Sequence, residues 1–418
     1  MKRSVLVVDS GGRGVALAWK LERDGCEVFR LPGNMDIKDI LRFAREKNVL
    51  LTVPGSEDLL AKGIVDTFHE AGKLIFGPTF KAARLETSKL YARLFMRKNH
   101  IPQPEFIVTT NQTAARVAKK RLGLPVVVKA DGLAAGKGAI VCRSEEEFEE
   151  ALKIMFIERR FGSACDLVLI ERCVEGEELS VFFDCDGFSY KILGTAQDYK
   201  RIGDNDTGEN TGGMGAYSPT PLSTPGLMKK VEEKILIPTL MCLQKRGMPY
   251  TGVLYVSLMI SGDDIYVIEF NARFGDPETQ VVLPLLESSL FDLLYNTALG
   301  WLDRTEVEMK PGYATTVVLA SGGYPGPYEK DKEIFGLENL GPDEIMFHAG
   351  TREENGRHFT AGGRVLNPVG VAGTLGESIR KAYVTAGKIS FAGMHYRKDI
   401  GQRGLRYIAQ GVNKTLRK

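Results

Sequence analysis

The chain has 418 residues, of which 43% are hydrophobic and 26% are charged, a composition typical of globular proteins with two or three domains. Its formal net charge of +2, with acidic and basic residues interspersed, argues against a strong electrostatic field for nucleic acid or a membrane surface. The six cysteines form no CxxC pair and no zinc-like spacing with the five histidines, so we expect neither zinc nor a disulfide framework.

The first apolar run, in MKRSVLVVDS, ends at Asp9 and is shorter than the core of a signal peptide. No stretch of the sequence approaches the roughly 18 uncharged apolar residues that span a membrane. We therefore expect a cytoplasmic protein with no membrane and no nucleic-acid partner.

Residues 4–31, SVLVVDSGGRGVALAWKLERDGCEVFRL, predict a strand, a glycine turn, a helix and a second strand, which open a doubly wound α/β unit. The glycines of the turn do not match the dinucleotide-binding pattern G-x-G-x-x-G, and the second strand ends in Arg30 and Leu31 rather than in an acidic ribose ligand. A dinucleotide-binding dehydrogenase is therefore the weakest interpretation.

A helix predicted over residues 83–106, which two prolines end, leads to the glycine-rich segment VVVKADGLAAGKGAIV at residues 126–141. Its flanks predict strands, so the segment is a strand, a mobile loop and a strand. It is not a Walker A loop, because the glycine spacing is too short and no Ser or Thr follows the loop lysine. Glycine N–H groups and lysines suit phosphate oxygens, although an ordinary glycine hairpin is the alternative. The candidate phosphate ligands are Lys129, Gly136, Lys137 and Gly138.

In VLIERCVEGEELS a strand is predicted to end after Ile170 and another to begin near Leu179. Backbone groups of the intervening turn could pair with an adenine edge, and a carboxylate there could accept from ribose hydroxyls. Acidic turns are usually just exposed. What favours binding here is the position of this turn in the sequence, between the glycine-rich segment at residues 126–141 and the segment YVIEFNARFGDPE at residues 266–278. The residues concerned are Glu171, Arg172, Cys173, Val174 and Glu178.

The polar segment QDYKRIGDNDTGENTGGMGAY at residues 197–217 exceeds the roughly 12–15 residues of ordinary connecting loops, so we expect it to be functional. Its glycines permit close approach of the backbone to a small ligand, and Asp206 could hold an ammonium group. Lys200 and Arg201 could counter a carboxylate or phosphate. The candidate substrate ligands in this loop are Asp206, Thr207, Gly212, Gly213, Met214 and Gly215.

In YVIEFNARFGDPE, residues 266–278, strand alternation places Glu269, Asn271 and Arg273 on one face and Ile268, Phe270 and Ala272 on the other. A carboxylate and an amide oxygen side by side suit Mg²⁺, which leaves its other positions to water and nucleotide phosphates. A solvated strand face is the alternative, but apolar neighbours indicate burial, and a buried charge without a partner is costly.

The flap, hinge, glycine loop and E-x-N strand, in this order, resemble the ATP-grasp superfamily, and within it the phosphoribosylamine–glycine ligase family. The resemblance runs through KADGLAAGKG, GDNDTGENTGGMGAYSP, IEFNARFGDPETQ, LASGGYPG, FHAGT, GGRVL and FAGMHYRKDIG, from end to end of the chain. It implies an ATP-grasp fold, α/β and α+β in class, in three domains. These are a doubly wound α/β substrate-binding domain over 1–96, an ATP-grasp domain over 97–312 with a flap subdomain at about 118–184, and a small α+β domain over 313–418.

The resemblance implies that ATP phosphorylates the carboxylate of glycine and that the amine of 5-phosphoribosylamine attacks the acyl phosphate. Lys129 and Lys137 would contact the ATP phosphates, and Glu269 and Asn271 would hold Mg²⁺ or Mn²⁺. The glycine loop and Arg273 would hold glycine and the developing product, with Lys137, Arg273 and Asp206 as the catalytic residues. The expected partners are small molecules only, for a monomer or small homo-oligomer.

Three departures from the family lie in the first domain, at the presumed sugar-phosphate site. The family usually reads G-G-R-E-H-A-L where this chain has GGRGVAL, its stretch after PGN is longer, and PGSEDLL replaces G-P-E-x-P-L, with Glu57 standing in for the family's glutamate. The candidate sugar-phosphate ligands are Gly11, Gly12, Arg13, Asn34 and Glu57. Two alternatives stay open: a related ligase that uses another amine, and a non-catalytic nucleotide-binding relative.

Overall fold

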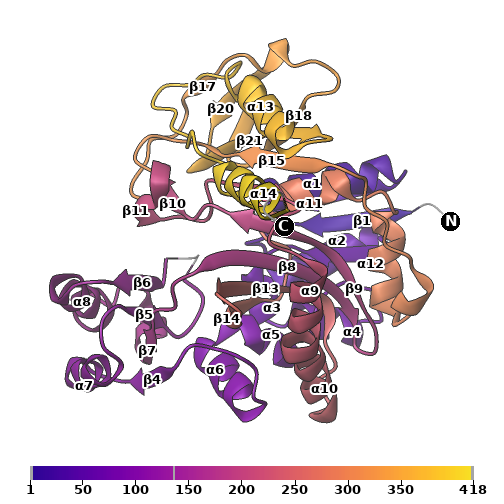
Figure 1. The fold of residues 1–418 in the computed structure, drawn as a ribbon. Coiled ribbons are helices and arrows are strands. Elements are labelled where there is room, and N and C mark those ends of the chain that lie inside the picture. The colour runs from indigo at the N-terminus through magenta and orange to yellow at the C-terminus, as the bar shows by residue number, and fades with distance from the viewer. Residues whose placement is uncertain (1–2, 135–136, 416–418) are drawn as a thin grey trace.

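The computed structural model describes residues 3–134 and 137–415 (Figure 1). Gly136, one of the candidate phosphate ligands, lies outside the described residues. None of the helices that the described residues form combines the length and the apolar character needed to cross a bilayer.

The chain begins with a parallel sheet of three strands in the order β2-β1-β3. The central strand is buried along its whole length, because Val5 and Val7 enter one hydrophobic core and Leu6 and Val8 enter another. The predicted strand, glycine turn, helix and strand are confirmed. The elements are β1 (Ser4–Val8), α1 (Gly12–Arg23), β2 (Glu27–Leu31), α2 (Ile37–Glu46), β3 (Leu51–Pro54), α3 (Glu57–Ala61), α4 (Ile64–Glu70), α5 (Phe80–Thr87) and α6 (Lys89–Lys98).

The single helix predicted over residues 83–106 is wrong, because Ser88 interrupts it with an extended backbone, φ −136° and ψ 112°. The Ser88 hydroxyl accepts the N–H of Tyr91 over 3.0 Å and so caps α6. This break turns the chain sharply between α5 and α6 and brings the start of α6 to the end of a distant strand.

A separate lobe, the flap lobe, follows at residues 106–172 and extends to the left in Figure 1. It is an antiparallel sheet of four strands in the order β4-β7-β5-β6, with two helices packed on a core around Phe148. The predicted strand, loop and strand are confirmed, since Val126 pairs with Cys142 and Lys129 with Ala139. The elements are β4 (Phe106–Thr109), α7 (Gln112–Leu122), β5 (Val126–Ala130), β6 (Ala139–Cys142), α8 (Glu145–Leu152) and β7 (Val168–Arg172).

A sheet of nine strands forms the body of the molecule, in the order β14-β13-β8-β9-β12-β15-β21-β16, with β18 also paired to β21. Strands of the middle and the end of the chain thus belong to one sheet. The strands are β8 (Glu177–Asp186), β9 (Tyr190–Asp198), β12 (Gly215–Ser218), β13 (Thr251–Ser261), β14 (Asp264–Asn271), β15 (Tyr313–Val317), β16 (Leu319–Ala320), β18 (Ile345–His348) and β21 (Arg364–Ala372). Its helices are α9 (Pro225–Val231), α10 (Ile237–Lys245), α11 (Thr279–Val282), α12 (Leu290–Leu299), α13 (Leu375–Ala386) and α14 (Gln402–Thr415).

Two small sheets complete the fold. The first is the hairpin of β10 (Arg201–Gly203) and β11 (Thr207–Asn210), which lies within the segment expected to be a long loop. The second joins β17 (Glu333–Ile334), β19 (Thr351–Glu354) and β20 (Arg357–Thr360) in the last part of the chain. Parallel, antiparallel and helical layers therefore occur together, which confirms the expected α/β and α+β class.

β14 carries one irregularity that matters for the site. Ser257 of β13 pairs with Glu269, whereas the next residue, Leu258, pairs with Val267, so Ile268 is an extra residue in a β-bulge. Phe270 then returns to the hydrophobic core.

Candidate active site

A side chain of the flap lobe reaches the large sheet at β14, its edge strand. Arg93 of α6 donates to the carbonyl oxygens of Val267 and Ile268, both over 2.8 Å. Lys129, at the end of β5, reaches the Ile268 carbonyl oxygen over 3.4 Å. Three segments far apart in the sequence are therefore joined at the bulge of β14.

Glu171 of β7 is the common partner of these two cations. Its carboxylate lies 2.6 Å from Arg93 Nε and 2.8 Å from Lys129 Nζ, and the three side chains are buried. Burial alone would raise the pKa of Glu171, but Arg93 and Lys129 outweigh it and hold this pKa at about 2. Burial, aided by Arg93, lowers the pKa of Lys129 against the opposing effect of Glu171. Two cations share one carboxylate, which leaves an excess of positive charge that suits an anionic ligand.

The turn expected to contact adenine is shorter than the sequence indicated. β7 continues through Arg172, because it pairs with its neighbours to that point, so only residues 173–176 connect it to β8. The backbone N–H groups of Arg172 and Cys173 donate to carbonyl oxygens over 2.9 and 3.2 Å. These donors and the Glu171 side chain have partners within the protein, and Val174 lies within the connecting turn; the adenine contacts expected of this segment stay a prediction.

Lys89, at the start of α6, also lies beside the flap loop, although the sequence did not single it out. Its ammonium group donates to the carbonyl oxygen of Gly132, in the flap loop, over 2.9 Å. Asp131 accepts from the Ser88 hydroxyl and from the N–H of Leu90, both over 3.1 Å, and so joins the start of α6 to the end of β5. The serine before Lys89 is the signal that could have found it, since Ser is a frequent N-cap residue.

Lys137 and Gly138, the two candidates of the flap loop that the structure describes, have other partners than Arg93, Lys129 and Glu171. Lys137 is exposed, and its ammonium group donates to the carbonyl oxygen of Pro325, near the end of the chain, over 2.8 Å. The carbonyl oxygen of Gly138 accepts from the N–H of Ala130 over 2.9 Å. A phosphate contact by Lys137 would therefore require its release from Pro325.

Glu269 and Asn271 lie on the face of β14 opposite Phe270 and Ala272, which are in the core. This agrees with the predicted alternation, apart from Ile268, which the bulge removes from it. Asn271 is 7% exposed and its amide nitrogen has no hydrogen-bond partner among the described residues. That nitrogen is a donor and binds no cation, but the amide oxygen of Asn271 and the Glu269 carboxylate are the oxygen donors that a divalent metal prefers.

Four cations surround Glu269. Burial would raise its pKa, but the charges of Lys200, Lys89, Lys129 and Arg273 together lower the pKa below the ordinary value. The carboxylate is therefore ionised at neutral pH, which is the state in which it would bind a metal ion.

Glu178, the expected ribose ligand, is paired with Lys200 over 3.0 Å. Burial acts to lower the pKa of Lys200, yet Glu178, Asp198 and other anionic groups raise it well above its ordinary value. Lys200 is therefore a fixed cation at the end of β9, close to the carboxylates of Glu178 and Glu269. A ribose contact by Glu178 would share the carboxylate with this ammonium group.

Asp206 contacts the end of the chain rather than an open site. One carboxylate oxygen is 3.0 Å from Arg397, and the other is paired with Arg403. Thr207 is exposed, and its hydroxyl donates to the carbonyl oxygen of Asp204 over 2.9 Å. The carboxylate of Asp206 thus has two guanidinium partners within the protein, and its expected ammonium contact stays a prediction.

Gly212 and Gly213 lie against the RFGDPE segment. The Gly212 carbonyl oxygen accepts from Arg364 over 2.7 Å, and Arg364 also pairs with Asp276 over 3.0 Å. Gly213 has a φ of +111°, and a Cβ there would lie 2.4 Å from Cδ of Pro277. Only glycine permits this close approach of the two segments.

Met214 and Gly215 occupy packing positions. The Met214 side chain is fully buried, and its N–H donates to the carbonyl oxygen of Tyr199 over 2.7 Å. Gly215 begins β12, and a Cβ there would lie 2.7 Å from the carbonyl oxygen of Thr316 on β15. Strand packing accounts for both residues, and their expected substrate contacts stay a prediction.

Four of the five first-domain candidates meet the segment after β14. Arg273 Nε lies 3.3 Å from Glu57, and Arg13 donates to the carbonyl oxygen of Phe274 over 3.1 Å. The glycine turn before α1 also lies close to this part of the chain. A Cβ on Gly11 would lie 3.5 Å from the Asp276 side chain, and a Cβ on Gly12 would lie 2.6 Å from the Gln280 side chain. Asn34 differs, because it is exposed in the turn between β2 and α2.

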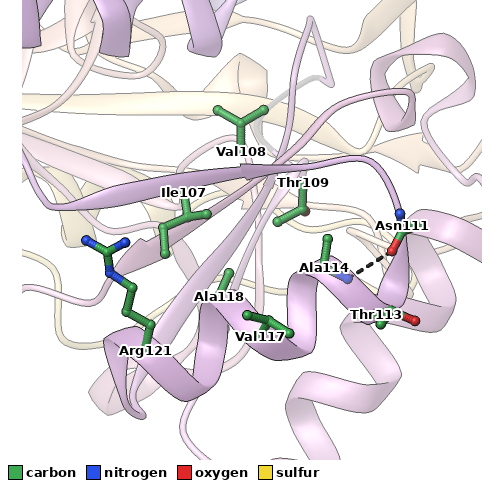
Figure 2. Close-up of a pocket in the computed structure, with 9 residues that line it drawn as sticks. All are labelled: Ile107, Val108, Thr109, Asn111, Thr113, Ala114, Val117, Ala118 and Arg121. Carbon is green, nitrogen blue, oxygen red and sulfur yellow. Dashed lines mark hydrogen bonds between the residues drawn. The ribbon is translucent and has the colours of Figure 1, made fainter.

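The groove in Figure 2 lies elsewhere, between β4 and α7 of the flap lobe. Ile107 and Thr109 point toward Val117 of α7, whereas Val108 projects from the other side of β4, and Asn111 caps α7 by accepting the N–H of Ala114 over 2.9 Å. Neither element carries a candidate site residue, so this groove is separate from the chemistry described above.

Three family models match the chain in succession. They are the N domain of phosphoribosylglycinamide synthetase over residues 3–86, its ATP-grasp (A) domain over 87–279 and its C domain over 314–403. The domain limits given above stay a prediction.

Curated relatives match along nearly the whole chain. A phosphoribosylamine–glycine ligase of Chlorobaculum tepidum is 44% identical, over 96% of this chain and 100% of that protein. A bifunctional purine biosynthetic protein of Pichia angusta is also 44% identical, over 97% of this chain, which spans 54% of that longer protein.

Solved structures agree with these matches. The crystal structure of a phosphoribosylamine–glycine ligase from Thermotoga maritima has a TM-score of 0.80 and 35% identity, over 95% of this chain and 99% of that one. The biotin carboxylase domain of a Hydrogenobacter thermophilus 2-oxoglutarate carboxylase, solved with MgADP, has a TM-score of 0.73 at 17% identity, over 95% and 92% of the two chains. The second likeness is one of fold alone.

Proposed function

This chain belongs to the phosphoribosylglycinamide synthetase family, and from that premise we propose how its residues carry out the family's reaction. The reaction is the ATP-dependent ligation of glycine to 5-phospho-D-ribosylamine, which gives glycinamide ribonucleotide, ADP and phosphate. The names of the full-length relatives favour it over the two alternatives that the sequence left open. The observation that carries the assignment to residues is the convergence of Lys129, Glu269 and Arg273 beside the end of β14.

The ATP phosphates would bind at the buried cluster of Lys129, Arg93 and Glu171. Its excess positive charge supports this role, and Lys89 adds a second ammonium group to the same place. Lys137 and the glycine N–H groups of the flap loop would close over the phosphates once Lys137 leaves Pro325. Adenine would lie along the turn at residues 173–176.

Glu269 and Asn271 would hold Mg²⁺ or Mn²⁺, which when bound neutralises charge on the phosphate oxygens. The two residues offer the oxygen donors that such ions prefer, and the surrounding cations keep Glu269 ionised. The identity of the metal is part of the proposal, as is a cytoplasmic location.

Arg273 would bind the carboxylate of glycine and then the oxygens of the glycyl phosphate. The protein supplies no covalent nucleophile in this mechanism; its residues align the carboxylate with the γ-phosphate and keep water from the intermediate. Gly213 supports this placement, because it approaches Pro277, in the segment that follows Arg273, closely enough to exclude a side chain. The amine would enter from the side of Gly11, Gly12 and Arg13.

The test is to measure ADP and phosphate release by the purified protein with Mg-ATP and glycine, with and without freshly generated 5-phosphoribosylamine. We expect release that requires both substrates, with the amide product identified by mass. Release with glycine and a different amine would redirect the proposal to a related ligase. Absence of release with either would leave a protein that binds nucleotide without turnover.

A further inference from the structure

Glu86 connects α5 to the residues that follow β14, the strand of Glu269 and Asn271. It lies in the last turn of α5, and its side chain is 7% exposed. One carboxylate oxygen lies 3.0 Å from a terminal guanidinium nitrogen of Arg273, and the other accepts the N–H of Ala272 over 2.7 Å. Glu86 therefore holds the two residues that immediately follow Asn271.

These two contacts make different demands on the side chain. The N–H of Ala272 needs only an acceptor, which a neutral amide could provide. The guanidinium group of Arg273 uses the negative charge, and burying an ionised carboxylate without need would be costly. A charged Glu86 would therefore act on Arg273 rather than on the backbone.

Arg273 is oriented on several sides at once. Glu57 lies 3.3 Å from its Nε, and its own Nη1 donates to the carbonyl oxygen of Phe274 over 3.2 Å. With Glu86 on another nitrogen, the guanidinium group has a fixed direction before any substrate arrives. Such preorganisation is what a group that stabilises developing negative charge requires.

The charges of the neighbours are consistent with this arrangement. Burial, and then the charge of Glu57, raise the pKa of Glu86 to about 7, although Arg273 opposes them. Burial acts to lower the pKa of Arg273, but Glu86 and Glu57 keep it above its ordinary value. The guanidinium group therefore stays charged, with an ionised Glu57 on one side and a Glu86 that is partly ionised at neutral pH on the other.

We propose that Glu86 is a positioning residue of the ligase: it fixes the guanidinium group of Arg273 and the backbone after Asn271 in the geometry that glycine and its acyl phosphate need. This inference rests on the proposed function. It adds a residue of α5 to a site whose other groups come from α3, α6, the flap lobe and the large sheet.

The test is Glu86→Gln in the full-length protein, which keeps the shape and an acceptor for Ala272 but removes the charge. We expect kcat/KM for glycine to fall roughly ten- to hundredfold, as for the loss of one buried hydrogen bond to a charged group, with the KM for ATP changed by less than about twofold. A uniform loss, in which the ATP parameters worsen as much as those for glycine, would indicate general structural damage and overturn the proposal.

A double-mutant cycle asks whether Glu86 acts through Arg273. If it does, the variant that combines Glu86→Gln with Arg273→Lys loses little more than Arg273→Lys alone. Independent, additive losses would overturn the proposal. Lys81→Gln removes an exposed charge from the same helix and serves as the matched control, with kinetics expected to equal those of the wild type.

Two further outcomes are distinguishable. If the wild-type protein itself forms no ADP with both substrates, it is the proposed function that fails. If Glu86→Gln does not fold, Glu86→Asp decides, because it keeps the charge but is too short to hold both contacts. A raised KM for glycine in that variant supports the role of Glu86, and a wild-type KM overturns it.

Discussion

Arg93 and Lys129 share Glu171 but hold it differently. Arg93 contacts both carboxylate oxygens, whereas Lys129 contacts one. Arg93→Met would leave a buried carboxylate with a single partner, so we expect the free energy of unfolding to fall by about 3–5 kcal/mol. Lys129→Met leaves Arg93 in place, so its main effect should be a lower kcat/KM for ATP. Urea denaturation of both variants checks this, and equal losses of stability would contradict it.

Glu269 is expected to determine the metal dependence. Glu269→Gln removes the charged oxygen ligand, so the metal concentration for half-maximal rate should rise roughly tenfold or more. Binding of Mn²⁺ in the presence of ATP, followed by electron paramagnetic resonance, gives a readout independent of turnover. Asp264→Asn, at the exposed start of the same strand, is the control. An unchanged affinity for Mn²⁺ in Glu269→Gln would remove this residue from the metal site.

Asp184 is expected to make stability depend on pH. Burial raises its pKa to about 8, and its Oδ1 has no hydrogen-bond partner among the described residues, while Oδ2 accepts from Thr297 over 2.6 Å. The folded state therefore keeps a proton that the unfolded state loses near pH 4, so stability falls as the pH rises from about 4 to about 8. Asp184→Asn should flatten this slope in thermal melts. A slope identical to that of the wild type would show that Asp184 is not its source.

At the scale of elements, the flap loop is bound to the last part of the chain through Lys137 and Pro325. Lys137→Ala removes both this contact and the proposed phosphate contact, so we expect a higher KM for ATP or slower phosphoryl transfer. Rapid-quench measurement of ADP formation separates the two effects. Lys120→Ala, on the exposed side of α7 in the same lobe, is the control. A wild-type rate for Lys137→Ala would exclude it from the site.

The elements that local patterns define could be predicted. The apolar run of β1, the glycine loop between β5 and β6, and the alternation of Glu269 and Asn271 depend on neighbours in sequence. The bulge at Ile268 could not, because nothing local distinguishes an extra residue in a strand from a regular one. The length of the turn after β7 could not be predicted for a similar reason. Pairing with β4 and β5 extends β7 beyond its apolar run, so the turn is shorter than the sequence indicated.

Roles that depend on distant partners were the hardest to foresee. The sequence pattern assigns Glu86 and Lys89 to one continuous helix. The structure separates them at Ser88, whose extended backbone ends α5 and whose hydroxyl contacts Asp131. Asp206 carries a carboxylate in a glycine-rich loop, which suggested a ligand contact, but in the structure it pairs with Arg397, far along the sequence. A single sequence does not report such pairings.

At the scale of the whole molecule, the nine-stranded sheet passes from the ATP-grasp strands into the last part of the chain through the pairing of β12 with β15. A chain that ends at residue 312 would lose β15 and expose β12 as an edge strand. We expect this truncated protein to aggregate, because unpaired edge strands recruit other chains. Light scattering against the full-length protein checks this; a monomeric, soluble product would mean that the two parts of the sheet fold independently.

The extra residue of β14 has a consequence for how this chain tolerates deletions. A chain without Ile268 would pair Val267 and Glu269 with consecutive residues of β13, and the alternation of core and site side chains would be preserved. Such a deletion would therefore look harmless by hydrophobic pattern. It would nevertheless remove the carbonyl oxygen that Arg93 and Lys129 both reach, and with it one of the contacts that hold the flap lobe to the large sheet. Ile268 thus contributes its backbone carbonyl oxygen to the contact between these parts of the chain.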